Sequence, residues 1–194
     1  MLAAERMDAR DVMDGTLGCP ICRAEFRIAG GVARFEEDSP AAATLMQAPD
    51  EDEALRLAAL LDLTDARGYA IVQGELGNHA PRLCELTDVQ LMLVDPPPGI
   101  AMGSGLSGIT TSATSHALPL AAASARGIAL PTTATPKSLI AALAVLAPAG
   151  RLLAPVRLPL PDGVTELARD ERQWLGARER APSASGIVRL DRRQ

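Results

Sequence analysis

The sequence predicts an α/β domain with a small β unit in front of it. Residues 69–94 read as a strand, a glycine-containing turn, a helix and a second strand, which is the pattern of a parallel βαβ unit. A leucine stripe at helical spacing precedes this unit at 51–62, and a helix beginning at Pro136 follows it. The 194-residue chain is 47% hydrophobic and 22% charged, a globular composition.

The N-terminal third divides into three parts. Residues 1–14 mix acids and arginines and predict a frayed or weakly helical lead. Residues 15–35 predict two short strands around a cysteine knuckle, with the Gly30-Gly31 pair as a hairpin turn. An acidic stretch rich in proline and alanine follows and predicts a linker. We therefore expect a lead and knuckle at 1–36, a linker at 37–50 and the main domain at 51–194.

Further elements follow from the same patterns. Asn78 is a candidate N-cap for a helix that runs to about Leu86. Four glycines interrupt 99–115, so we expect no helix there. We predict further strands at 69–73, 89–94, 109–112, 125–130 and 152–156, and a final antiparallel pair from 174–178 and 187–191.

The composition excludes several classes of function. Aromatic residues make up only 2% and the net charge is −5, which argues against nucleic-acid binding. Three cysteines are too few for a disulfide framework, and no apolar stretch is long enough to cross a membrane. We expect a soluble, cytoplasmic protein without membrane association, whose partner is another protein or a second copy.

Two segments of the sequence resemble known protein families. Residues 17–35, LGCPICRAEFRIAGGVARF, resemble the zinc-ribbon-like module of small methyltransferase activators. Residues 51–193 resemble a class I S-adenosylmethionine-dependent methyltransferase domain in the order of AIVQGELGN, the LVD ending at Asp95, HALPLAAASARGIAL and LIAALAVLAPAGRLLAPV. The resemblance implies a Rossmann-like sheet, mostly parallel with an antiparallel C-terminal strand, and a small N-terminal β knuckle.

The resemblance also implies a cofactor site. Gly74 and Gly77 lie where such enzymes have a glycine-rich loop, and Asp95 lies where an acid binds the ribose hydroxyls. The alternative is a plain turn at the two glycines and an aspartate that only ends its strand. The family's acid before the loop is Val72 here, and no carboxylate stands in the Thr114-Ser115-His116 stretch.

Cys19 and Cys22 have the spacing of metal ligands, and the resemblance implies zinc. The complete module has a second cysteine pair, which this chain lacks, so a metal-free turn and zinc shared by a dimer both stay open. A redox role is a further alternative. We expect both histidines, His79 and His116, at the surface.

These observations leave three hypotheses for the function. The first is a methyltransferase-like protein with a degraded cofactor site, without catalytic residues, that acts by binding or assembly. The second is an active S-adenosylmethionine-dependent methyltransferase with a minimal site. The third is a zinc-ribbon adaptor that activates a partner enzyme.

Overall fold

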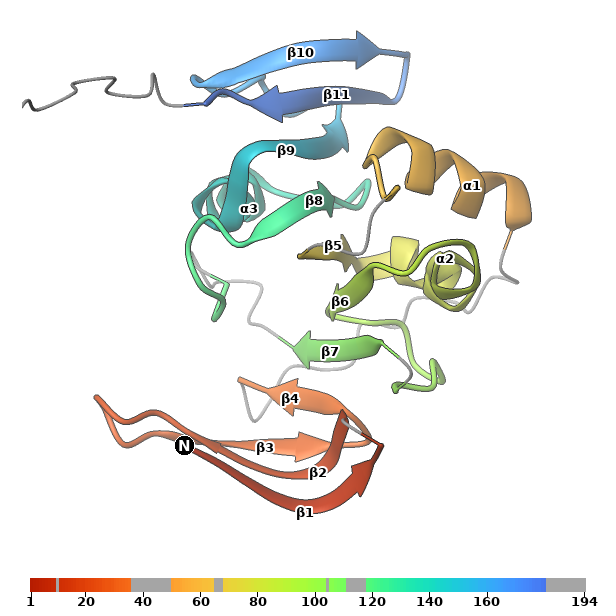
Figure 1. The fold of residues 1–194 in the computed structure, drawn as a ribbon. Helices are drawn as coiled ribbons and strands as arrows, with labels where there is room; N and C mark the ends of the chain where they lie inside the picture. The colour runs from red at the N-terminus through yellow and green to blue at the C-terminus, as the bar shows by residue number, and fades with distance from the viewer. Residues whose placement is uncertain (10, 36–49, 65–67, 104, 111–117, 181–194) are drawn as a thin grey trace, which may run out of the picture.

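The computed structural model describes residues 1–9, 11–35, 50–64, 68–103, 105–110 and 118–180 (Figure 1). The helices are α1 (Glu51–Leu60), α2 (Ala80–Leu86) and α3 (Pro136–Val145), with a 3₁₀ helix η1 (Gly74–His79). The strands are β1 (Leu2–Asp8), β2 (Asp11–Gly18), β3 (Glu25–Ala29), β4 (Val32–Arg34), β5 (Tyr69–Gln73), β6 (Gln90–Val94), β7 (Leu106–Thr110), β8 (Ala125–Ala129), β9 (Leu146–Pro155), β10 (Val164–Arg169) and β11 (Gln173–Arg178).

All these strands form one sheet in the order β1-β2-β3-β4-β7-β6-β5-β8-β9-β11-β10. The middle of the sheet, from β4 to β9, is parallel. Both ends are antiparallel: the meander β1 to β4 at one end, and β11 with β10 at the other. The α/β class is therefore confirmed, although antiparallel pairs are as frequent as parallel ones among the described strands.

The N-terminal lead is the first correction. The expected frayed or weakly helical segment at 1–14 is instead β1 and the first half of β2, which pair as a hairpin. A cross-strand ion pair of 2.5 Å joins the Arg6 guanidinium to the Asp14 carboxylate. Gly15 has no side chain, and a Cβ there would lie 2.3 Å from the Ala3 carbonyl oxygen. Arg6 and Asp14, two of the mixed charges in this segment, are therefore cross-strand neighbours.

The C-terminal strand pair is the second correction. β11 matches the strand expected at 174–178, and its two antiparallel partners in the sheet are β10 and β9. Residues 187–191 lie outside the described part of the chain. Five of the six residues of β10 are exposed, so this strand has no apolar run for the sequence analysis to detect.

The helices begin largely where capping residues predict. The Asp50 carboxylate accepts the N–H of Asp52 at 3.0 Å and starts α1. Thr135 and Ser138 form a capping box at the start of α3. The Asn78 cap is wrong: its amide donates to the Glu75 carbonyl inside η1, and His79 is the residue before α2.

The core has two parts, one on each face of the sheet. Helices α1 and α2 cover one face and α3 covers the other (Figure 1). Trp174 is fully buried on the α3 side, where its indole N–H donates to the Leu158 carbonyl at 2.9 Å. The chain between β6 and β7 holds no helix in its described residues, as the glycines predict. No helix within the described ranges is long and apolar enough to span a membrane.

Candidate functional site

The strand order places a crevice at the carboxyl ends of β5 and β8. From β5 the sheet grows one way through β6 to β7 and the other way through β8 to β9. The loops after β5 and β8 therefore diverge to opposite faces, and open parallel sheets bind ligands at such a switch point. The predicted cofactor residues Gly74 and Gly77 lie in the loop after β5.

Gly74 faces a proline of the chain itself. Its φ of +61° is in the left-handed region, which favours glycine. A Cβ at Gly74 would lie 3.3 Å from Cβ of Pro131, which follows β8. The space beside this glycine is therefore already filled by the neighbouring loop.

Gly77 is packed in the same way. A Cβ there would lie 2.9 Å from Cδ of Pro97, in the loop after β6. Gly77 is buried, and its φ is not positive. Close contact with Pro97 is therefore sufficient to explain why glycine is needed at this position.

Glu75 joins the two loops across the switch point. One oxygen of its carboxylate, Oε1, accepts the backbone N–H and the hydroxyl of Thr132, each at 2.8 Å. These two hydrogen bonds hold the loop after β5 against the loop after β8. Neither Glu75 nor Thr132 belonged to the predicted site, because only the pairing of β5 with β8 brings them together.

Asp95 directly follows β6, as predicted, and lies half-buried next to the end of β5. Its φ is +52°, and its backbone N–H donates to the Ile109 carbonyl at 2.8 Å. The Gln73 side-chain amide donates to its carboxylate at 3.5 Å. The structure thus brings Asp95 to the same edge of the sheet as Gly74, and the carboxylate has a protein partner there.

A hollow of about 660 Å³ opens beside this crevice, and we call it the switch-point hollow. It lies between the loops after β5 and β8, helix α1 and the turn from β10 to β11. The lining residues are Glu53, Arg56, Glu75, Leu76, His79, Thr132, Asp170, Glu171, Arg172 and Gln173.

His79 is buried, contrary to the prediction from the sequence. The ring was expected at the surface, but only 8% of the residue is exposed. The helical turn η1 carries it inward, and its Nδ1 accepts the N–H of Asp50 at 3.4 Å. His116 lies outside the described residues.

The cysteine knuckle forms the turn between β2 and β3. The backbone N–H groups of Cys22 and Ile21 and the Cys22 thiol donate to the Cys19 sulfur, which lowers the pKa of the Cys19 thiol. Within the described ranges, no cluster of three or more metal-ligating side chains occurs. Cys84 is half-buried in α2, and burial raises the pKa of its thiol. A four-ligand zinc site at Cys19 and Cys22 would therefore need further ligands from outside the described residues.

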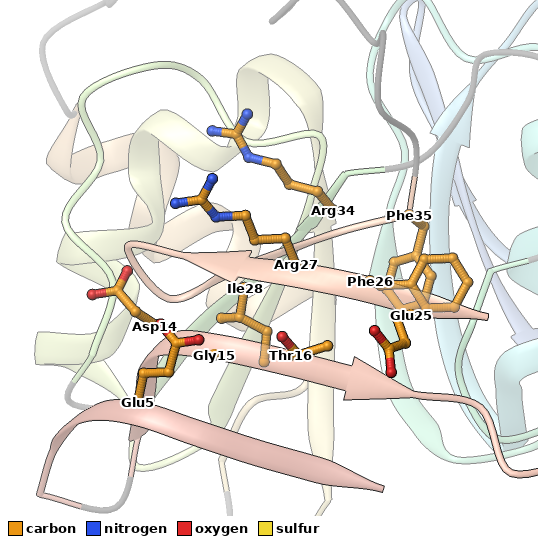
Figure 2. Close-up of a pocket in the computed structure, with 10 residues that line it drawn as sticks. All are labelled: Glu5, Asp14, Gly15, Thr16, Glu25, Phe26, Arg27, Ile28, Arg34 and Phe35. Carbon is orange, nitrogen blue, oxygen red and sulfur yellow. The ribbon is translucent and has the colours of Figure 1, made fainter. Parts of the chain in front are cut away.

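A second hollow, of about 680 Å³, lies on the N-terminal meander (Figure 2). Arg27 and Arg34 extend in the same direction from neighbouring strands there, and Asp14 lies beyond Arg27. The rings of Phe26 and Phe35 pack at 4.6 Å between centroids. Acids and arginines both line this hollow, so its charge selects no one class of ligand.

Comparison with known proteins adds only the fold. No family model matches the chain, and no curated protein matches it. A crystal structure of a Corynebacterium glutamicum protein, solved as a structural-genomics target, is similar with a TM-score of 0.51 at 15% identity. The match covers 77% of this chain and 94% of the other. At this identity the likeness extends to the α/β arrangement and not to the function.

Proposed function

We propose that this chain is a methyltransferase-like protein whose cofactor crevice is filled by its own residues, and that it acts by binding or assembly. The contact between Gly74 and Pro131 is the main support. In the resembled family, glycines after the first parallel strand allow the cofactor to approach the backbone. Here Pro131 lies on that side of the glycine, 3.3 Å from where a Cβ of residue 74 would be.

Two further observations support the proposal. Glu75 bonds to Thr132 and ties the two loops that would have to part around a ligand. Pro97 packs on Gly77 from the β6 side. Both observations support a crevice that is occupied by the chain's own residues.

Calorimetric titration with S-adenosylhomocysteine tests the proposal. We expect no heat of binding up to millimolar ligand, with a known class I methyltransferase titrated from the same stock as the control. Micromolar binding, about −8 kcal/mol, would contradict the proposal. A thermal unfolding curve of the same sample would show that the protein is folded.

The active-enzyme alternative is favoured by Asp95. The residue ends β6 beside β5, where an acid binds ribose hydroxyls in nucleotide-binding α/β folds. If this alternative holds, Asp95→Asn abolishes S-adenosylhomocysteine binding that the wild-type chain shows.

Zinc at the knuckle stays a proposal of its own. Cys19 and Cys22 would supply two thiolates, and the remaining ligands would come from a second copy or a partner. Metal analysis of the purified protein, together with its mass in solution, tests this. A half-equivalent of zinc per chain in a dimer supports the shared site. The adaptor hypothesis requires in addition an enzyme that co-purifies and loses activity on removal of the chain.

A further inference from the structure

We infer that the cysteine knuckle of a single chain binds one copper(I) ion between the sulfurs of Cys19 and Cys22. The inference goes beyond the proposed function and does not depend on the cofactor crevice. Three features of the knuckle lead to this metal: the fixed backbone of the turn, the closeness of the two sulfurs and the number of ligands that lie together.

The backbone of the knuckle is held by its own hydrogen bonds. The Cys19 N–H donates to the Ala24 carbonyl at 2.8 Å, and the Arg23 N–H donates to the Cys19 carbonyl at 3.0 Å. Arg23 has a φ of +62°, which turns the chain back into β3. Because the loop is closed without a metal, little conformational freedom is lost when an ion binds.

The two sulfurs of the knuckle lie within hydrogen-bonding distance of each other. The Cys22 thiol donates to the Cys19 sulfur, and neither cysteine is in a disulfide. The backbone N–H groups of Ile21 and Cys22 donate to the same sulfur. Such N–H groups stabilise the negative charge of a metal-bound thiolate. One ion can therefore sit between two thiolates that the turn already brings together.

The number of ligands selects the metal. In the described part of the chain, no third histidine, cysteine or carboxylate side chain joins Cys19 and Cys22. A structural zinc ion takes four ligands. Copper(I) is a soft ion that thiolates select, and it is stable with only two of them in a linear arrangement. One chain therefore supplies a complete ligand set for copper(I).

The knuckle is open to a metal ion from solvent. Cys22 is exposed, and its neighbour Ile21 is 92% exposed. Binding exchanges protons for the metal: each thiol releases its proton to water as its sulfur bonds to copper. The bound unit of one copper(I) and two thiolates carries one negative charge, and copper keeps its oxidation state throughout.

Transfer of copper(I) from its violet bicinchoninate complex tests the inference. The full-length chain is titrated into the complex without oxygen, and the loss of violet absorbance is followed. We expect the chain to take up one copper(I) ion per chain, with its mass in solution unchanged. X-ray absorption at the copper edge should show two sulfur neighbours. Failure to withdraw copper, or one ion shared by two chains, overturns the inference.

Cys22→Ser is the test variant, because serine keeps the size of the side chain and removes the soft ligand. We expect copper(I) to bind more weakly by roughly a hundredfold or more, since loss of a ligand costs more than loss of an outer-shell partner. Cys84→Ser is the matched control, on the half-buried thiol of α2, and should bind as wild type. Unchanged affinity in a folded Cys22→Ser chain overturns the inference.

The copper site and the shared zinc site have different outcomes. A half-equivalent of zinc per chain in a dimer, without uptake of copper(I) by the single chain, overturns the inference and supports the shared site. Copper(I) uptake by a monomer that depends on Cys19 and Cys22 supports the inference. Titration with S-adenosylhomocysteine tests the proposed function separately, because the crevice at β5 and β8 contains neither cysteine.

Discussion

At the scale of single residues, the sequence predicts the position of the glycine turn at the switch point but not its contacts. The position of Gly74 after β5 could be predicted from the sequence, because the strand, turn and helix are local. What faces the glycine could not, because Pro131 lies 57 residues further along and arrives only through β5–β8 pairing. The contact between Glu75 and Thr132 could not be predicted from the sequence for the same reason. Local patterns predicted the elements, and long-range contacts determined what the site contains.

Gly77→Ala tests the packing of the glycine turn. The added Cβ would sit 2.9 Å from Pro97, and overpacking of this kind costs about 1–3 kcal/mol. We expect the midpoint of urea unfolding to fall. Gly18→Ala is the control, because its Cβ would have only the Met1 carbonyl oxygen within 4 Å, at 3.6 Å. An unchanged midpoint in Gly77→Ala would mean that the Pro97 loop yields without cost.

The cysteines should differ in their reaction with iodoacetamide. Cys22 is exposed, whereas Cys84 is half-buried and burial raises the pKa of its thiol. Because the thiolate is the reactive form, Cys84 should react more slowly at pH 8 and speed up only above the ordinary pKa of about 8.5. Peptide mass mapping over time measures both rates. Equal rates would be evidence against a buried Cys84.

At the scale of elements, the ends of helices and strands were predicted best where a local signal marks them. Thr135 and Pro136 mark the start of α3 in the sequence, and the helix begins there. The strand β10 carries no such signal, since five of its six residues are exposed and polar and apolar side chains are mixed along it. The strand β1 was missed for the same reason, because all seven of its residues are exposed.

Thr135→Ala removes the hydroxyl that accepts the Ser138 N–H at 3.2 Å and starts α3. We expect a loss of about 1 kcal/mol in the free energy of unfolding. Thr135→Ser keeps the hydroxyl and should lose much less. Chemical denaturation of the two variants in parallel gives the comparison, and equal losses would show that the cap does not stabilise the helix.

The turn between β10 and β11 should lose stability in acid. The N–H groups of Gln173 and Arg172 donate to the Asp170 carboxylate and hold its pKa below the usual value. This contribution is therefore complete above the unfolded pKa of about 3.9 and disappears as the pH falls through the lowered value. The stability difference between wild type and Asp170→Asn should shrink below about pH 4. A difference that stays constant from pH 7 to 3 would contradict the role of this charge.

At the scale of the whole molecule, one sheet joins regions of unequal burial. The meander meets the parallel strands through β4, which pairs with β7 over three residues. β1 contributes nothing to the core, whereas β5 and β8 are buried between two helix-covered faces. The sequence predicted the two regions but not their continuity, because the register of β4 against β7 depends on residues far apart in the chain.

The rates of amide hydrogen exchange should follow the unequal burial of the strands. We expect amides of β1 and β2 to exchange faster than those of β5 and β8, because exposed strands open at lower free energy than buried ones. Mass spectrometry of peptides from both regions measures the ratio. Equal protection throughout would instead mean that the sheet opens only as one cooperative unit.

The buried position of Trp174 has a practical consequence for spectroscopy. It is the chain's one tryptophan, and it packs on the α3 face of β11, with its N–H on the Leu158 carbonyl. The intrinsic fluorescence of this protein therefore reports on the β9–β11 end of the sheet. Occupancy of the hollow on the meander leaves that emission unchanged unless β11 itself moves, whereas the switch-point hollow is lined by Gln173, the neighbour of Trp174. A titration that leaves the fluorescence unchanged is therefore no evidence that no ligand has bound. Leu76→Trp would place a second tryptophan on the wall of the switch-point hollow.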